Sequence, residues 1–127
     1  MRKIRVGVVG LGRLGAIHAK IYSTLENTEL CGICDIDENT ARNAAETLKI
    51  SWSTDYKKLM DYKLDAVSVV TPTILHYEIA KFFLQNKIHT LIEKPITKTL
   101  KEAKDLIKIA DKNRLIIQVG HVERFNS

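Results

Sequence analysis

Residues 4–15 read IRVGVVGLGRLG, so that a short apolar run leads directly into three glycines spaced G-x-G-x-x-G. This spacing alone is weak evidence, because glycines gather in many tight turns. Here the apolar run predicts a strand over residues 4–9, and residues after the glycines repeat at helical spacing. An acid, Asp35, follows about 20 residues later. A strand, a glycine turn, a helix and a distal acid together predict a dinucleotide-binding site.

Each glycine of this turn has a separate expected role. Gly10 allows the tight turn, Gly12 lets a pyrophosphate approach the backbone, and Gly15 lets the helix pack closely on the strand. The start of the helix offers unpaired N–H groups and the positive end of its dipole to the phosphates. The predicted cofactor-binding residues of the turn are Gly10, Leu11, Gly12, Arg13, Leu14 and Gly15.

Asp35 and Ile36, at the end of the second predicted strand, bear on the choice of dinucleotide. The Asp35 carboxylate is expected to accept hydrogen bonds from the adenosine ribose hydroxyls. Its charge would repel the 2′-phosphate of NADP, and Ile36 supplies no compensating arginine, which favours NAD. Arg13 and Arg42 leave NADP open as the less favoured cofactor. The alternative for Asp35 is a turn role beside Asp37, a predicted helix N-cap.

Short apolar runs alternate with helical patterns along the whole chain. The runs are nearly continuous in apolar residues, which is typical of parallel strands covered on both faces. Strands are expected at 4–9, 30–35, 65–70, 88–93 and 115–120, with a shorter one around Trp52. The helical stripes are Leu14, Ile17, Ile21 and Leu25; Ala41, Ala44, Ala45 and Leu48; Leu75, Ile79, Phe82 and Phe83; and Leu100, Ala103, Leu106, Ile107 and Ala110. This alternation predicts an α/β fold with a doubly wound parallel sheet in one domain.

Charge and hydropathy exclude several function classes. The 20 basic and 15 acidic residues give a net charge of +5, but neither half of the chain is a basic block, so we predict no nucleic-acid partner. No apolar run approaches the roughly 18 residues that a membrane span needs. The start of the chain lacks a signal-peptide pattern, so we expect a cytoplasmic location without membrane partners.

The two cysteines form a C-x-x-C spacing inside the predicted strand LCGIC. A redox pair needs a helix N-terminus to lower the thiol pKa, and alternation along a strand should place Cys31 and Cys34 on opposite faces. We therefore predict buried, unreactive thiols. The four histidines occur singly, so no metal site is predicted: His18, His76, His89 and His121.

The segment after the fourth strand should face the ligand crevice, which lies at the carboxyl ends of parallel strands. Thr71, Pro72, Thr73 and His76 follow that strand and are predicted to contact the cofactor. The alternative is structural: the two threonines would cap the next helix, and His76 would cap and pack.

Glu93, Lys94 and Pro95 follow the fifth strand and should reach the same edge of the sheet. A solvated Glu93–Lys94 charge pair, with Pro95 ending the strand, would explain them structurally. The neighbouring glycine turn and Thr71 favour a functional role. A partly desolvated lysine near a nicotinamide can donate a hydrogen bond to a substrate hydroxyl or help to remove its proton.

Five segments in this order resemble the Gfo/Idh/MocA oxidoreductase family along the whole chain: GLGRLG, the Asp35 turn, VTPTILHYEIA, EKPITKTLKEA and VGHVERFN. The resemblance implies a Rossmann fold and an NAD(P)-dependent dehydrogenase acting on a secondary hydroxyl of a sugar, cyclitol or sugar nucleotide. It also implies that Lys94 is catalytic, that Glu93 lies near the nicotinamide, and that Pro95 follows a cis peptide bond. Thr71, Pro72 and His76 would then line the cofactor cleft.

The final segment resembles the version found in sugar-nucleotide dehydrogenases, including those acting on UDP-N-acetylglucosamine, and implies that His121 and Arg124 lie near the nicotinamide or substrate. Family members continue into a second domain that forms the substrate pocket, mediates homo-oligomerisation and carries a catalytic histidine. We therefore expect residues 1–120 to be the dinucleotide-binding domain and 121–127 to begin the crossover, so that this chain alone binds cofactor without turnover. The alternative is a non-catalytic NAD-binding sensor or scaffold, which would need no lysine.

Overall fold

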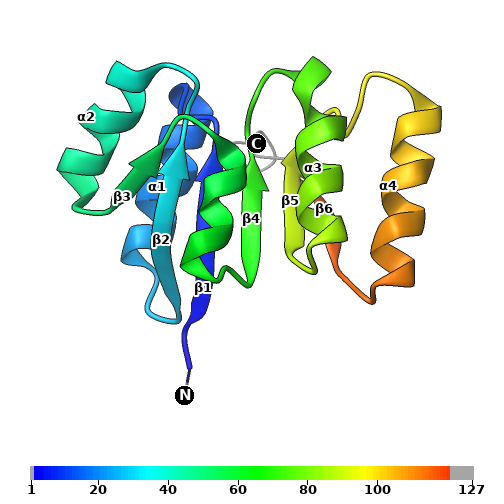
Figure 1. Ribbon diagram of the computed structural model, residues 1–127, viewed down its shortest axis with the longest axis horizontal. Coiled ribbons are helices and arrows are strands. Elements are labelled where there is room, and N and C mark those ends of the chain that lie inside the picture. The colour runs from blue at the N-terminus through cyan, green and yellow to red at the C-terminus, as the bar shows by residue number, and fades with distance from the viewer. Residues whose placement is uncertain (1, 121–127) are drawn as a thin grey trace, which may run out of the picture.

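The computed structural model describes residues 2–120, which form a six-stranded parallel sheet with helices on both faces (Figure 1). The strands are β1 (Ile4–Val9), β2 (Thr28–Cys34), β3 (Ser51–Ser53), β4 (Ala66–Val69), β5 (His89–Glu93) and β6 (Ile117–Gly120). The helices are α1 (Arg13–Thr24), α2 (Glu38–Leu48), α3 (His76–Gln85) and α4 (Leu100–Lys112), with 3₁₀ turns at Tyr56–Tyr62 and Thr73–Leu75. The predicted doubly wound fold is confirmed.

The strand order β3-β2-β1-β4-β5-β6 reverses direction between β1 and β4. Successive strands run outward from β1 to β3, and the chain then returns to the middle of the sheet at β4. Crevices form at the carboxyl ends of such a pair, because the loops that follow the two strands leave in opposite directions. The topology therefore places a ligand crevice between the turn after β1 and the loop after β4.

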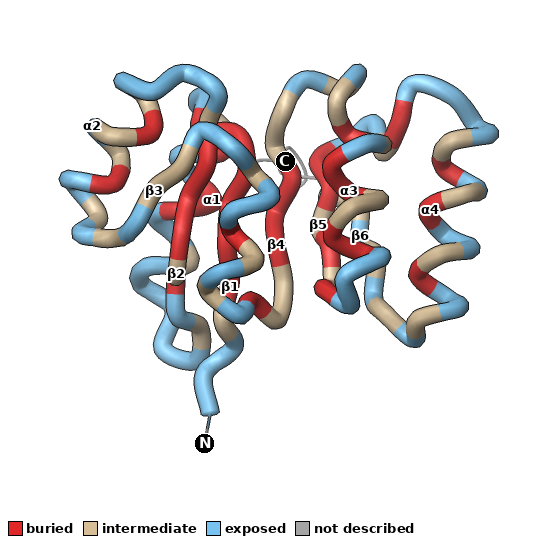
Figure 2. The backbone as a smooth tube through the Cα atoms, viewed as in Figure 1, coloured by how far each residue is buried: buried red, intermediate tan, exposed pale blue. Residues whose placement is uncertain are grey.

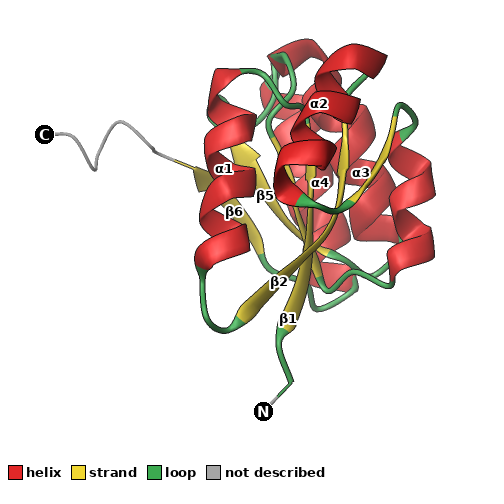
Figure 3. Cartoon of the chain, turned by 90° about the vertical axis from the view of Figure 1, so that its left-hand side faces the viewer, coloured by secondary structure: helices red, strands yellow, loops and turns green. Residues whose placement is uncertain are grey.

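Two apolar clusters hold the helices to the sheet, one on each face. In Figure 3, α1 and α3 lie on opposite sides of the strands, and Figure 2 shows buried residues concentrated in the central strands and the inner helix faces. The cluster beneath α1 and α2 includes Val6, Val8, Ala19, Leu30, Ile33, Ala41 and Ala45. The cluster beneath α3 and α4 includes Val67, Val69, Ile79, Phe83, Leu84, Ile92 and Leu106.

The face of α1 that was predicted to pack against the sheet is not the face that does so. Ile17, Ile21 and Leu25 are 42%, 49% and 44% exposed, and the helix instead turns Gly15, His18 and Ala19 toward the sheet. The glycine turn fixes this rotation, because Gly15 sits directly against the backbone of the preceding loop. In α4 the prediction was partly wrong as well: Ala103, Leu106 and Ala110 are buried, whereas Leu100 and Ile107 are exposed.

The prediction that Cys31 and Cys34 lie on opposite faces was also wrong. The register between β1 and β2 shifts at Val6/Gly7, where the paired residues of β2 jump from Leu30 to Gly32. A bulge of this kind adds one residue and breaks the simple alternation of faces. Both cysteines consequently pack against the cluster under α3 and α4, Cys34 buried and Cys31 only half-buried.

Side-chain caps define where two helices begin. Asp37 accepts a hydrogen bond from the Thr40 N–H at the start of α2, as predicted, and Thr99 accepts one from the Glu102 N–H at the start of α4. These caps satisfy N–H groups that have no partner within the helix. Within residues 2–120, no helix has the length and apolar character needed to cross a membrane.

Candidate dinucleotide-binding site

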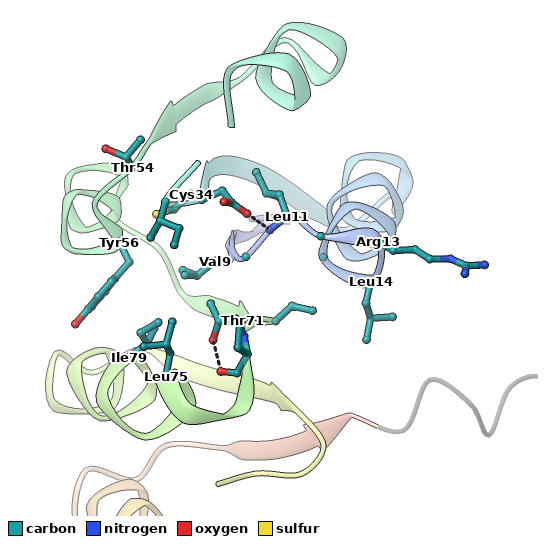
Figure 4. Close-up of a pocket in the computed structure, with 17 residues that line it drawn as sticks. Val9, Leu11, Arg13, Leu14, Cys34, Thr54, Tyr56, Thr71, Leu75 and Ile79 are labelled. Carbon is teal, nitrogen blue, oxygen red and sulfur yellow. Dashed lines mark hydrogen bonds between the residues drawn. The ribbon is translucent and has the colours of Figure 1, made fainter. Parts of the chain in front are cut away.

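A cavity of about 490 Å³ opens at the carboxyl edge of the sheet, at the point where the strand order reverses (Figure 4). Its wall combines the turn after β1, the end of β2 and the loop after β4. The predicted residues that the structure brings together there are Gly10, Leu11, Gly12, Arg13, Leu14, Gly15, Asp35, Ile36, Thr71 and Pro72. Figure 4 shows the Arg13 side chain extending away from the cavity, so this residue contributes mainly its backbone.

The three glycines of the turn differ in the space around them. Gly10 has a φ of +97°, and a Cβ on it would lie 2.6 Å from the Val70 carbonyl oxygen. A Cβ on Gly15 would lie 1.7 Å from the Gly10 carbonyl oxygen. Around Gly12, by contrast, no atom from beyond its two chain neighbours lies within 4 Å of the same position in the described part of the chain. Gly10 and Gly15 are therefore required by the close packing of the turn, whereas Gly12 leaves open space at the start of α1.

This open space fits a pyrophosphate. Gly12 is the N-cap residue of α1 and makes no side-chain capping hydrogen bond. The first N–H groups of a helix point outward from such a cap, and the helix dipole favours negative charge there. A phosphate can therefore approach the backbone at Gly12 without meeting a side chain.

The Asp35 carboxylate is fixed at the wall of this cavity by two backbone groups. The Leu11 N–H donates to Oδ2 at 2.8 Å, and the Asp37 N–H donates to Oδ1 at 2.9 Å. The turn role considered for Asp35 is thus confirmed. Each carboxylate oxygen retains a further lone pair, so the same group can also accept from a ribose hydroxyl. Beside it, Ile36 is 84% exposed, the most exposed of the large apolar side chains among residues 2–120.

The cavity also has an apolar side that sequence reasoning missed. Thr54 and Tyr56 follow β3, and Leu75 and Ile79 lie four residues apart at the start of α3. The Tyr56 ring packs edge-on against Phe82 at 5.5 Å between centroids. Burial, reinforced by nearby Glu78, raises the pKa of Tyr56. Thr54 could have been predicted as a cavity residue, because it directly follows the end of a strand. Leu75 and Ile79 could not, because their helical spacing assigned them to the core.

His76, which was predicted to line the cofactor cleft, lies beneath the surface of the loops. The side chain is 1% exposed and absent from the cavity wall. Its Nε2 lies 2.8 Å from the Thr71 carbonyl oxygen, and its Nδ1 lies 3.0 Å from that of Pro95. His76 therefore ties the loop after β4 to the loop after β5 from beneath. Thr73 also lies outside the cavity wall. No side chain caps the 3₁₀ turn at Thr73–Leu75 or the start of α3, so the capping role considered for the threonines is not seen there.

The segment after β5 does not form the solvated charge pair that was considered as its structural alternative. Glu93 is 7% exposed, and its Oε2 lies 2.9 Å from Nε2 of His18. Lys94 is exposed, and the Lys94–Pro95 peptide bond is cis, as the family resemblance implied. Neither Glu93 nor Lys94 contributes to the wall of the 490 Å³ cavity. They lie beyond β4, two strands from β1.

Two predicted contacts, His121 and Arg124, lie outside the described residues, as does the proposed crossover at 121–127. Among residues 2–120, the structure contains no group of three or more histidine, cysteine, aspartate or glutamate side chains placed to hold a metal ion.

The thiols provide a test of burial at the cavity. Burial, with nearby Asp35 and Asp55, raises the pKa of Cys34 to about 12, and partial burial raises that of Cys31. A raised pKa keeps a thiol protonated and unreactive until the pH approaches that pKa.

Near pH 8, we expect an aromatic disulfide reagent to modify only Cys31 in the folded chain, more slowly than free cysteine, and both thiols after denaturation. Rapid modification of folded Cys31→Ser would contradict the burial of Cys34.

These features define a class of protein. A parallel sheet that reverses order beside a glycine turn, with an oriented acid after β2, forms a dinucleotide-binding Rossmann domain. The chain belongs to the Gfo/Idh/MocA family: residues 4–121 match its model, described as an oxidoreductase family with an NAD-binding Rossmann fold.

Similar proteins include characterised dehydrogenases. The UDP-N-acetylglucosamine 3-dehydrogenase of Acidithiobacillus ferrooxidans is 36% identical over 98% of this chain and 39% of its own length, and its structure matches with a TM-score of 0.90. The scyllo-inositol 2-dehydrogenase (NAD(+)) of Bacillus subtilis is 35% identical over 98% of this chain and 37% of its own. A scyllo-inositol dehydrogenase from Lactobacillus casei, solved with NAD(H) and scyllo-inositol, is 26% identical with a TM-score of 0.89, covering 98% and 38% of the two chains. The chain thus spans about two fifths of these relatives.

Proposed function

We propose that this chain binds NAD and forms the nucleotide-binding part of a dehydrogenase that oxidises a secondary hydroxyl of a sugar, cyclitol or sugar nucleotide. The observation that carries the proposal is the open space at Gly12, at the start of α1, in a cavity that also holds the oriented Asp35. Membership of an oxidoreductase family supports the reaction class. The named activities of the relatives support the substrate class.

Each part of the cavity has a role in this proposal. The N–H groups at the start of α1 bind the pyrophosphate, and Asp35 accepts hydrogen bonds from the adenosine ribose. Ile36, Leu75 and Ile79 supply the apolar surface that an adenine requires. When bound, NAD supplies the hydride acceptor for the reaction.

Lys94 is the proposed catalytic residue. It is exposed at the carboxyl end of β5, on the side of β4 away from Asp35. A dinucleotide held at Asp35 and Gly12 and running across β4 would end near this lysine. There the protonated Lys94 side chain can donate a hydrogen bond to a substrate hydroxyl, and its neutral amine form can accept the proton of that hydroxyl. Since the relatives are much longer, we propose that further residues of the substrate pocket lie in a second domain. We therefore expect the chain alone to bind NAD without turnover.

The setting of the protein is part of the same proposal. We place it in the cytoplasm as a homo-oligomer, with a sugar-like substrate and without a nucleic-acid or membrane partner. The even distribution of charge along the sequence supports the absence of a nucleic-acid role. The two free cysteines agree with a reducing compartment.

Calorimetric titration of this chain with NAD and NADP tests the binding. We expect NAD to bind tighter by about tenfold or more, because the Asp35 carboxylate repels a 2′-phosphate. The matched variant Asp35→Asn keeps one oxygen that can accept from the Leu11 N–H but removes the charge, so the preference for NAD should shrink. Equal or tighter binding of NADP by the parent chain would contradict the role given to Asp35.

A further inference from the structure

A buried contact between His18 and Glu93 joins the helix that starts at the glycine turn to the segment that carries Lys94. His18 lies on the sheet-facing side of α1, and its Nε2 is 2.9 Å from Oε2 of Glu93 at the end of β5. Both side chains are buried. The edge of the Tyr22 ring packs near the His18 ring, with 6.4 Å between centroids. His18 and Glu93 are 75 residues apart in the sequence, so the contact is purely tertiary.

Gly120 also borders the Glu93 carboxylate. The two residues are paired in the register of β5 and β6. A Cβ on Gly120 would lie 2.6 Å from Oε2 and 3.0 Å from Cδ of Glu93. The absence of a side chain at Gly120 therefore leaves the space that the carboxylate occupies. The Glu93 carboxylate therefore lies against both His18 of α1 and Gly120 of β6.

Packing alone does not account for this pair. The same face of the sheet carries apolar Val8 and Ala19, and the Ser68 hydroxyl there lies 2.7 Å from the Tyr22 hydroxyl, so neither is a partner that the pair needs. Moving an imidazole and a carboxylate out of water is costly, and a well-packed apolar pair is often as stable. The pair lies at the ligand edge, one residue before Lys94. Meanwhile His76 holds the main chain of the same segment at the Pro95 carbonyl.

We propose that His18 is a positioning residue: by holding the Glu93 carboxylate, it fixes the Glu93–Pro95 segment at the nicotinamide end of the dinucleotide site. The inference rests on the proposed function, since it requires a dinucleotide that runs from Asp35 across β4 toward β5. The glycine turn and Asp35 contact the adenosine and pyrophosphate half. The His18–Glu93 pair governs contacts to the nicotinamide, the one part of NAD that ADP-ribose lacks.

This division predicts a selective effect on two ligands. ADP-ribose carries the adenosine and pyrophosphate of NAD but lacks the nicotinamide. Without the His18 ring, the buried Glu93 carboxylate loses its partner and cannot remain in the same place. NAD should then lose its contacts beyond β4, whereas ADP-ribose should bind as before.

The experiment is calorimetric titration of this chain with NAD and with ADP-ribose, for the parent and three variants. In His18→Ala, we expect NAD affinity to fall about tenfold and ADP-ribose affinity to stay within about twofold. His18→Gln, whose amide can donate to Glu93, should recover most of the loss. His89→Ala is the matched control, because His89 lies at the opposite end of β5 and should affect neither ligand.

Gly120→Ala tests the same positioning role by displacing Glu93 instead of removing His18. It replaces His18→Ala if His18→Ala does not unfold cooperatively. Its new Cβ takes the place of the carboxylate while His18 stays intact, so the same selective loss of NAD affinity is expected. An equal loss for both ligands, or no loss for NAD, overturns the positioning role. Parent NAD and ADP-ribose affinities that are already equal overturn it too. A parent chain that binds neither ligand instead overturns the proposed function and, with it, this inference.

Discussion

Gly15→Ala is expected to destabilise the chain by about 4 kcal/mol or more, a large share of the roughly 5–15 kcal/mol that stabilises a typical domain. The added Cβ would lie 1.7 Å from the Gly10 carbonyl oxygen and 3.5 Å from the Val70 side chain. Backbone atoms cannot move aside as the end of a flexible side chain can. Either α1 must shift away from the sheet or the glycine turn must open, and both movements disturb the core beneath α1.

Urea unfolding followed by circular dichroism measures this effect. We expect the midpoint for Gly15→Ala to fall well below that of the parent, or the folded baseline to be lost. If Gly15→Ala had the same urea midpoint as the parent, the fold would not require the close approach of Gly15 to the turn.

Gly12→Ala should have the opposite profile: nearly unchanged stability and a loss of NAD affinity of about 30-fold or more. Among residues 2–120, no atom from beyond the two chain neighbours of Gly12 lies within 4 Å of the new Cβ, and Gly12 has a φ of −64° and a ψ of −168°, which alanine adopts readily. Alanine is a poorer N-cap than glycine but restricts the unfolded chain, and these effects of about 1 kcal/mol or less oppose each other. The methyl group would fill the space through which a phosphate reaches the helix N–H groups, at a cost of about 2 kcal/mol in lost charged hydrogen bonds.

The two variants control for each other, because each adds the same methyl group to the same turn. Calorimetry with NAD and urea unfolding should be run on both. If Gly12→Ala bound NAD as tightly as the parent, the pyrophosphate would not lie at Gly12, and the role given to the start of α1 would be wrong.

The glycine turn could be predicted from sequence because its determinants are local. Gly10, Gly12 and Gly15 lie within six residues, and the following helix and distal acid have fixed spacing. The rotation of α1 could not be predicted in the same way. Ile17, Ile21 and Leu25 form the more apolar stripe, but the contact between Gly15 and the turn determines which face is buried. Steric fit between backbones outweighed hydrophobic periodicity.

Contacts between distant segments explain the remaining differences. His18 appeared as an isolated histidine because its partner, Glu93, is 75 residues away. His76 appeared to face the cleft because it follows the loop after β4, yet its two ring nitrogens lie next to carbonyl oxygens of two loops beneath that surface. The position of Cys31 depended on a bulge that is visible only in the pairing of β1 with β2. None of these depends on a local pattern.

Titration of the ¹⁵N-labelled chain with NAD, followed through its backbone amide resonances, tests the central claim most directly. The account predicts saturable shifts that are largest for Leu11, Gly12, Arg13 and Leu14, with a second group at Asp35 and Ile36. These amides lie at the start of α1 and at the end of β2, on the wall of the cavity. Saturable shifts centred elsewhere on the chain, or no saturable shifts at all, would contradict a dinucleotide site at the glycine turn.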